Sequence, residues 1–172
     1  DMDASDTLVA ALLEQAGPLI DGFEASRAAE GAALKTVILD QIDSIASLVK
    51  AGRSAAEARR SDQIASLKAA LIRLSEAAPQ VEPARLEQEL ALIAVKTDVT
   101  EELDRLRAHI VAARTLLAEP DQIGRKLDFL MQEFNREANT LCAKAQNPDL
   151  TRIGLDLKTV IDQMREQVQN LE

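Results

Sequence analysis

Apolar positions along the chain recur every three or four residues, which is the spacing of an amphipathic α-helix. The clearest apolar face belongs to the segment 123–141. Its members are Ile123, Leu127, Leu130, Phe134, Ala138 and Leu141. The last segment, from residue 150 to residue 171, keeps spacings of three and four that predict a narrow seam of coiled-coil type. No segment alternates apolar and polar residues as a strand would. We therefore predict an all-α fold in which long antiparallel helices form a helical hairpin and a bundle.

Glycine and proline residues divide the first half of the chain into separate predicted helices. Gly17 and Pro18 are expected to interrupt the first one, because proline lacks the amide hydrogen that a helix interior uses. A second helix then runs to Gly52, which marks a bend or a stop. The helical pattern resumes over residues 54–77.

The proline-containing stretch 77–83 is typical of a linker. It divides the chain into a predicted long helical hairpin or arm, residues 1–82, and a predicted C-terminal helical domain, residues 83–172. Within the second part, Thr100 either caps a new helix or lies inside a longer one. Asp121 is expected to cap the helix that follows it.

Composition and charge restrict the partners that the chain can have. Its 172 residues include 29 acidic and 20 basic side chains, a net charge of −9, so a polyanion would have to meet a local basic patch. The single cysteine, Cys142, excludes an internal disulfide. No apolar run is long enough to span a bilayer. These features favour a cytoplasmic protein without a membrane partner.

A second side of the segment 123–141 carries an unusual polar stripe. Its members are Arg125, Asp128, Gln132, Asn135 and Asn139. Asparagine is a poor helix former because its amide competes for backbone hydrogen bonds, so this stripe is expected to have another use. A similar stripe on the last helix consists of Asp156, Thr159, Gln163, Gln167 and Asn170. If the two helices pack antiparallel, the stripes flank one groove, and they serve either as a protein interface or as a substrate site.

Candidate catalytic residues are few, because the motifs of phosphate loops and zinc proteases are absent. His109 is the only histidine, and histidine side chains exchange protons near neutral pH. Glu102 lies on the same predicted helical face, while Glu133 and Glu137 lie one turn apart on the next helix. Carboxylates at that spacing repel each other unless a cation lies between them, and Mg²⁺ and Mn²⁺ prefer oxygen ligands. The alternative interpretation is an ordinary network of ion pairs on a solvated helix.

Two segments of the chain resemble the C-terminal signature of the YicC-like family and the segment that precedes it. They are LEQELALIAVKTDVTEELDRLRAHI, residues 86–110, and the stretch from Gly124 to Glu172 that contains NREANT and REQVQN. The resemblance implies a cytoplasmic endoribonuclease that cuts RNA with a divalent metal and assembles into ring-like homo-oligomers, as hexamers. The family's N-terminal strand-containing domain has no counterpart in this sequence, so we expect a C-terminal fragment.

On these grounds we predict a metal-dependent endoribonuclease that uses Mn²⁺ or Mg²⁺. The predicted catalytic residues are His109, Glu133 and Glu137, and the predicted metal ligands are Glu102, His109, Glu133 and Glu137. The predicted RNA-binding residues are Arg125, Lys126, Gln132, Asn135, Arg136, Asn139 and Lys144. Because only three residues are aromatic, we expect RNA to be recognised by its backbone and shape. The alternative function is a non-catalytic module for helical oligomerisation or RNA-binding regulation.

Overall fold

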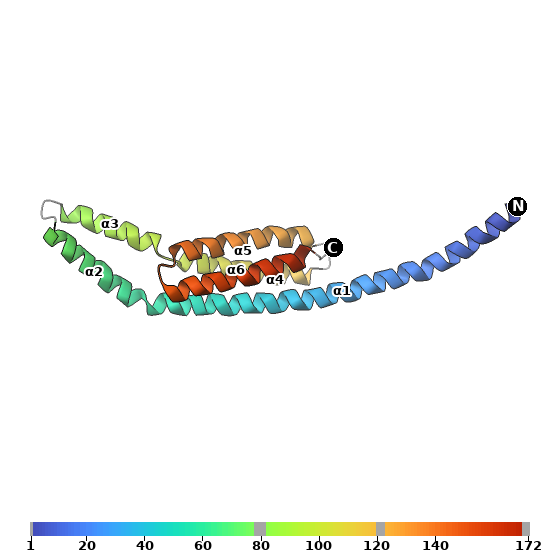
Figure 1. The fold of residues 1–172 in the computed structure, drawn as a ribbon, viewed down its shortest axis with the longest axis horizontal. Coiled ribbons are helices and arrows are strands. Elements are labelled where there is room, and N and C mark those ends of the chain that lie inside the picture. Colours follow the sequence, from blue (N-terminus) through green and yellow to red (C-terminus); the bar gives the residue numbers. More distant parts are fainter. Residues whose placement is uncertain (1, 78–81, 120–122, 170–172) are drawn as a thin grey trace.

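The computed structural model describes residues 2–77, 82–119 and 123–169. These residues form six α-helices and no strand, which confirms the all-α prediction (Figure 1). The helices are α1 (Met2–Ala58), α2 (Arg60–Ala77), α3 (Pro83–Lys96), α4 (Thr100–Ala118), α5 (Gly124–Lys144) and α6 (Pro148–Gln169). None of the described helices is both long enough and apolar enough to cross a membrane.

The second half of α1 packs with α4, α5 and α6 into a four-helix bundle (Figure 1). Helix α1 contacts α4 and α6, and α5 contacts the same two helices from the other side. Each helix contributes fully buried side chains to the shared core, among them Ile42, Leu106, Phe134 and Leu157. Burial of a large apolar side chain contributes roughly 1.5–3 kcal/mol, so this core holds the four helices in place.

Helix α1 is continuous from Met2 to Ala58, so the predicted interruption at Gly17 and Pro18 is wrong. The proline removes one backbone hydrogen bond, the one that the carbonyl of Glu14 would have accepted. This part of α1 is exposed, and water can satisfy that carbonyl. Helix α1 therefore continues through Pro18, because water reduces the free-energy cost of the lost hydrogen bond.

The predicted bend or stop at Gly52 is also wrong, because this residue lies inside α1. A Cβ atom built at Gly52 would lie 3.1 Å from Leu103 Cδ2 and 3.6 Å from Ile153 Cγ2. The missing side chain therefore lets α1 approach α4 and α6 closely. The break comes later, at Arg59, between α1 and α2.

A second close approach joins α5 and α6 at Gly154. A Cβ atom at this position would lie 2.4 Å from the Sγ atom of Cys142 and 3.0 Å from Leu141 Cδ2. The thiol of Cys142 is partly buried, and burial raises its pKa. The two helices thus meet at a glycine that leaves room for the cysteine side chain.

Two parts of the chain project from opposite ends of the bundle (Figure 1). The first half of α1 extends alone, and its large apolar residues are exposed, including Leu13 (70%) and Leu19 (75%). At the other end, α2 and α3 pack on each other as a hairpin. The predicted division between residues 82 and 83 falls between these two paired helices, and it stays a prediction.

The connection before α4 resolves the alternatives for Thr100, because a new helix begins at this residue. Thr100 does not provide the cap. Instead its backbone amide donates a hydrogen bond to Asp98 Oδ1 at 2.8 Å. The hydrogen bonds from Thr100 lower the pKa of the Asp98 carboxyl group, with its hydroxyl as the largest cause. The predicted cap at Asp121 lies outside the described residues.

Candidate functional site

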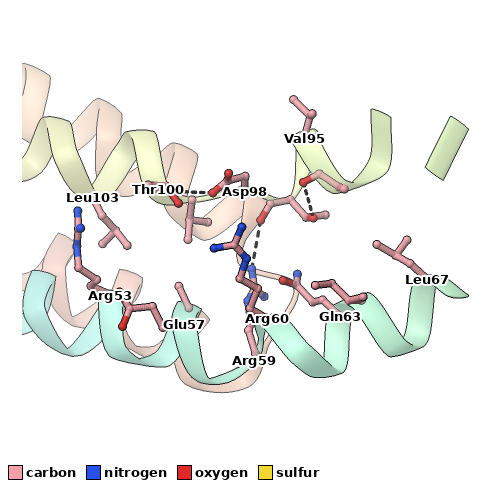
Figure 2. A pocket seen from close by; sticks show the side chains of 15 residues that line it. Arg53, Glu57, Arg59, Arg60, Gln63, Leu67, Val95, Asp98, Thr100 and Leu103 are labelled. Carbon is pink, nitrogen blue, oxygen red and sulfur yellow. Dashed lines mark hydrogen bonds between the residues drawn. The ribbon is translucent and has the colours of Figure 1, made fainter. Parts of the chain in front are cut away.

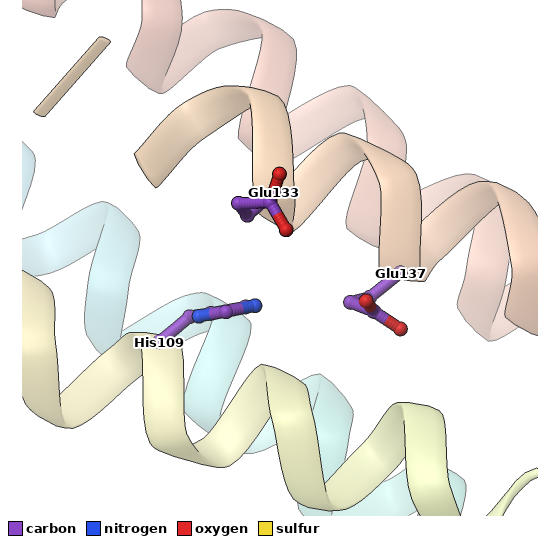
Figure 3. Close-up of side chains that lie close together, drawn as sticks. All are labelled: His109, Glu133 and Glu137. Atoms are coloured by element: carbon purple, nitrogen blue, oxygen red, sulfur yellow. The ribbon is translucent and has the colours of Figure 1, made fainter. Parts of the chain in front are cut away.

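Three of the predicted site residues meet between α4 and α5. His109 of α4 faces Glu133 and Glu137 of α5, which lie one helical turn apart (Figure 3). One potential ligand atom from each residue lies within 4.8 Å of the others. We refer to these residues as the His–Glu–Glu cluster. The packing of two helices thus brings His109 next to two glutamates that follow it by 24 and 28 positions in the sequence.

The residues of the His–Glu–Glu cluster differ in their access to solvent. Glu137 is buried, with 2% of its surface exposed, whereas half of the Glu133 side chain is exposed. The His109 ring packs edge-on against Phe134, with ring centroids 5.5 Å apart. Its Nε2 atom is buried and has no hydrogen-bond partner within the described residues. A buried polar atom without a partner costs about 1–3 kcal/mol, so a ligand on Nε2 would be stabilising.

The chemistry of the His–Glu–Glu cluster fits a divalent cation. One imidazole nitrogen and two carboxylates supply both the donor atoms and the negative charge that such an ion requires. Imidazole is a common ligand of transition metals, while Mg²⁺ favours oxygen donors throughout, so this mixed set fits Mn²⁺ better than Mg²⁺. His109, Glu133 and Glu137 are therefore the residues that would hold the ion.

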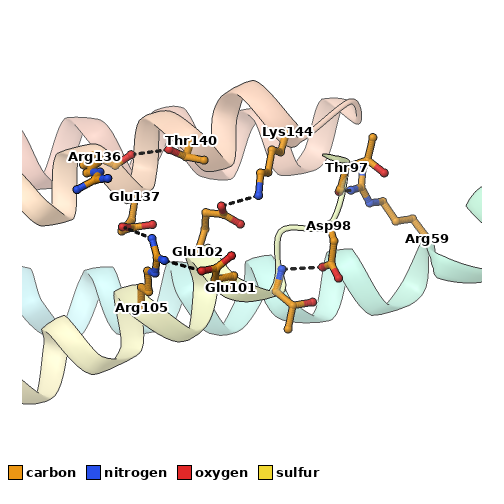
Figure 4. A network of polar contacts seen from close by, with 11 residues as sticks. Arg59, Thr97, Asp98, Glu101, Glu102, Arg105, Arg136, Glu137, Thr140 and Lys144 are labelled. Atoms are coloured by element: carbon orange, nitrogen blue, oxygen red, sulfur yellow. Dashed lines mark hydrogen bonds and ion pairs between the residues drawn. The ribbon is translucent and has the colours of Figure 1, made fainter. Parts of the chain in front are cut away.

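Glu102, the fourth predicted ligand, is not part of this cluster. It is buried in the first turn of α4, and its Oε1 atom accepts a hydrogen bond from Lys144 Nζ at 2.7 Å (Figure 4). Its Oε2 atom is buried and has no hydrogen-bond partner among the described residues. The structure therefore pairs a predicted metal ligand with a predicted RNA-binding lysine, and both of those roles stay predictions.

Arg105 is part of the site, although we predicted no catalytic, metal-binding or RNA-binding role for it. Its Nη1 atom donates a hydrogen bond to Glu137 Oε1 at 3.3 Å, and its Nη2 atom donates one to Glu101 (Figure 4). The hydrogen bond to Glu137 raises the pKa of the Arg105 guanidinium. Spacing offered one signal, because Arg105 lies one helical turn after Glu101 and one turn before His109.

The polar stripe of α5 lies on the opposite flank of that helix and faces α6. Asn135 Nδ2 donates a hydrogen bond to Asp162 Oδ1 of α6 at 3.2 Å, and Arg165 Nε lies 3.9 Å from Asp128 Oδ1. Asn139 in turn donates to Asn135 at 2.9 Å. These contacts join α5 to α6 within one chain, and both interpretations of the stripe, as a protein interface or as a substrate site, stay predictions.

One further residue of the α5 stripe makes a contact within that stripe, and one residue of the stripe on the last helix is not described. Gln132 donates a hydrogen bond to Asp128 Oδ2 at 3.1 Å, within the stripe itself. Asn170, predicted to belong to the stripe of the last helix, lies outside the described residues. The RNA-binding roles of Gln132, Asn135 and Asn139 stay predictions.

The remaining predicted RNA-binding residues are exposed basic side chains of α5. Arg125 is exposed, and Lys126 Nζ lies 2.8 Å from Glu119 Oε2. Arg136 Nη1 lies 3.8 Å from Glu133 Oε2, and 70% of the Arg136 side chain is exposed. Arg136 is thus the predicted RNA-binding residue that contacts the His–Glu–Glu cluster directly.

Comparison with known proteins identifies the group to which the chain is related. The family model described as "Endoribonuclease YicC-like, C-terminal" matches residues 52–172. The chain belongs to this YicC-like family. The predicted resemblance is therefore confirmed, and the matched region includes all three residues of the His–Glu–Glu cluster.

Two curated relatives carry the name "Probable endoribonuclease YicC". The one from Haemophilus influenzae is 42% identical over 167 residues, which cover 97% of this chain and 57% of the relative. The one from Clostridioides difficile is 42% identical over 88 residues, which cover 51% of this chain and 30% of the relative. The YicC-like chain thus spans little more than half the length of its Haemophilus relative.

The YicC-like region also contains a pocket of about 600 Å³ at the junction of the bundle and the α2–α3 hairpin (Figure 2). Arg59 lines it and donates hydrogen bonds to the carbonyl oxygens of Thr97 and Ala145. Burial lowers the pKa of the Arg59 guanidinium. Because Thr97 precedes α4 and Ala145 follows α5, this arginine connects three interhelical junctions, an arrangement that the sequence did not reveal.

Proposed function

We propose that this YicC-like chain carries the metal-dependent centre of an endoribonuclease at His109, Glu133 and Glu137. One observation carries the proposal: donor atoms from two helices converge within 4.8 Å, and the Nε2 atom of His109 is buried without a hydrogen-bond partner among the described residues. The names of the two curated relatives support RNA as the substrate.

A divalent ion held by these residues would polarise a phosphodiester group and stabilise the charge that develops during cleavage. The half-exposed Glu133 is the cluster residue that a strand in solvent reaches first, while Glu137 is buried and forms an ion pair with Arg105 in this structure. Phe134 orients the His109 ring. If His109 does not bind the ion, its position would let it accept a proton from the hydroxyl group that attacks the phosphodiester.

Basic side chains beside the cluster would hold the flanking phosphates. Arg136 contacts Glu133 of the cluster, and Lys126 lies two helical turns before Glu133 on the same helix. Since the whole chain has a net charge of −9, phosphate binding depends on this local patch and on the bound cation. We propose that the substrate is cytoplasmic RNA, bound through its backbone.

The test is cleavage of a structured RNA by this chain in Mn²⁺, followed on a denaturing gel. We expect discrete fragments that disappear with excess chelator and with His109→Ala or Glu133→Gln. Asp104→Asn is the matched control, because Asp104 lies on α4 but pairs with Arg53. Undiminished cleavage by His109→Ala would remove this residue from the proposed centre.

The full-length Haemophilus relative should be assayed beside the chain, because the region similar to this chain covers only 57% of the relative. Cleavage by the relative but not by the chain would show that the rest of the relative contributes to activity. Cleavage by neither protein, with a range of RNAs and Mn²⁺ present, would contradict the proposed function.

A second function, homo-oligomeric assembly, is favoured by the exposed apolar face of α1. Leu8, Leu12, Leu19 and Phe23 are each between 59% and 75% exposed. Contiguous apolar surfaces of this kind mark interaction sites. Sedimentation velocity of the chain and of Leu12→Lys would test assembly, and a single monomeric species for both would contradict it. The predicted hexamer is one assembly that this measurement would detect.

A further inference from the structure

Arg105 lies between the buried end of the His–Glu–Glu cluster and solvent (Figure 4). Half of its side chain is exposed, whereas 3% of the Glu137 side chain is exposed. Its two terminal nitrogen atoms divide their contacts between the buried Glu137 and the exposed Glu101. Arg105 is therefore the residue that compensates the buried carboxylate of the cluster from the solvent side.

A divalent cation and Arg105 need the same carboxylate. The Oε1 atom of Glu137 accepts the Arg105 hydrogen bond, and the Glu137 carboxylate also lies in the group of potential ligands with His109 and Glu133. Two positive groups within a few ångströms repel each other strongly where water is partly excluded. Binding of the cation is therefore expected to weaken the bond between Arg105 and Glu137.

We propose that Arg105 is a phosphate-binding residue that leaves Glu137 when a divalent ion occupies the His–Glu–Glu cluster. The proposal rests on the proposed function, because it takes the cluster as the metal site and RNA as the ligand. A guanidinium group offers paired N–H donors that match the geometry of a phosphate. Glu101 retains one contact to Arg105, so the released side chain stays beside the cluster.

The acidic residues around the cluster determine when Arg105 can bind a phosphate. Without an ion, Glu101, Glu133 and Glu137 repel a phosphate, and Arg105 is already bonded to two of them. With an ion, the acids are compensated and Arg105 becomes available. Ion and RNA are therefore expected to bind cooperatively, and each raises the affinity of the other by the same factor.

The first measurement is the affinity of the chain for Mn²⁺, with and without Arg105. Because His109 is the only histidine, broadening of its imidazole NMR signals by Mn²⁺ reports the cluster directly. Arg105→Gln should bind Mn²⁺ roughly threefold to tenfold more tightly, since it removes a competing hydrogen bond to a carboxylate. Arg105→Lys retains a cation near Glu137 and should restore most of the competition.

Arg114→Gln is the matched control for this measurement. Arg114 lies on the same helix, is also 50% exposed and pairs with a carboxylate, that of Asp43, away from the cluster. Its substitution should leave Mn²⁺ affinity unchanged. Equal Mn²⁺ affinities for the unmodified chain and for Arg105→Gln, both folded by circular dichroism, would overturn the proposal.

The second measurement is the coupling between ion and RNA, with a short 2′-O-methyl RNA that resists cleavage. Saturating Mn²⁺ should tighten RNA binding roughly fivefold or more in the unmodified chain, and this factor should fall close to one in Arg105→Gln. Coupling that survives the substitution would overturn the phosphate-binding role of Arg105.

The outcomes also separate this inference from the proposed function. If Mn²⁺ leaves the His109 signals unchanged, both proposals are overturned, because the cluster then holds no ion. If ion and RNA binding are coupled through Arg105 but neither this chain nor the Haemophilus relative cleaves RNA, the inference is supported and the proposed catalytic function is contradicted.

Discussion

Lys144, in the last turn of α5, donates a 2.7 Å hydrogen bond to Glu102, in the first turn of α4. The two side chains are 27% and 4% exposed. A lysine at the C-terminal end of a helix and a glutamate at the N-terminal end each compensate the helix dipole. This pair therefore stabilises both helices and fixes α4 beside α5, which is the packing that forms the His–Glu–Glu cluster.

Lys144→Met should destabilise the chain, because it leaves the buried carboxylate of Glu102 without its cation. Removal of one partner from a buried ion pair costs about 3–5 kcal/mol, and the partial exposure of Lys144 reduces the expected loss to about 2–4 kcal/mol. Urea unfolding followed by circular dichroism measures this change. The double variant Lys144→Met/Glu102→Gln removes the buried charge and should recover most of the loss. If Lys144→Met were as stable as the unmodified chain, the stabilising role of the Lys144–Glu102 pair would be contradicted.

Gly154→Ala should weaken the contact between α5 and α6. The added methyl group would overlap the Cys142 Sγ atom, 2.4 Å away, and overpacking of this kind costs about 1–3 kcal/mol. Thermal unfolding gives the measurement. Combination with Cys142→Ala removes the sulfur and should restore part of the stability, while the contact with Leu141 remains. Equal melting temperatures for the single and double variants would show that the sulfur is not the obstacle.

Asp98→Ala should lower stability at neutral pH and have a smaller effect in acid. The pKa of this carboxyl group is lowered in the folded chain, chiefly by hydrogen bonds from Thr100. Its contribution is therefore present above the unfolded pKa, about 3.9, and is lost as the pH falls through the lower folded pKa. Because the side chain is exposed, we expect a cost of about 0.5–1 kcal/mol at neutral pH, the lower range for the loss of a hydrogen bond.

The pH dependence is checked by comparing unfolding free energies of the two chains at neutral pH and at about pH 2.5, below the unfolded pKa. Asp98→Asn also lacks the titrating group, so its stability difference from the unmodified chain should change with pH by the same amount, while its retained hydrogen-bond acceptor should make the cost smaller than that of Asp98→Ala at both pH values. A cost for Asp98→Ala that is the same at both pH values would show that the charge makes no contribution.

Arg59→Met should loosen the junction between the bundle and the α2–α3 hairpin. It removes the hydrogen bonds that the carbonyl oxygens of Thr97 and Ala145 accept, at an expected cost of about 1–2 kcal/mol in total. Hydrogen exchange should increase in the segments around residues 97 and 145. Arg60→Met, at the exposed neighbouring arginine, is the control, and an equal increase in that variant would contradict a specific role for Arg59.

Periodicity predicted the apolar faces of the last two helices correctly. Leu127, Phe134 and Leu141 of α5 and Leu157 and Ile161 of α6 are buried as expected. These predictions succeed because a stripe of apolar residues at helical spacing must turn toward a core. The helix-breaking preferences of proline and glycine wrongly predicted that α1 would be interrupted at Pro18 and Gly52. Helix α1 continues through both positions because solvent surrounds Pro18 and close packing against α4 and α6 surrounds Gly52.

The candidate site was predictable only in part. His109, Glu133 and Glu137 have side chains suited to metal binding, and two adjacent antiparallel helices bring them together. The partners of Glu102 and Arg105 depend on the vertical register between α4 and α5, which sequence spacing does not contain. The amide stripe was interpretable in two ways because asparagine side chains bind substrates and neighbouring helices with the same hydrogen-bonding groups.

The solitary first half of α1 affects how the isolated chain behaves in a test tube. Its exposed apolar side chains include Leu19 and Phe23. Sulfate or phosphate in the buffer makes the exposure of apolar surface to water less favourable. Apparent mass and light scattering should therefore rise with protein concentration and with such salts. Assays of different variants are comparable only at one dilution and in one buffer.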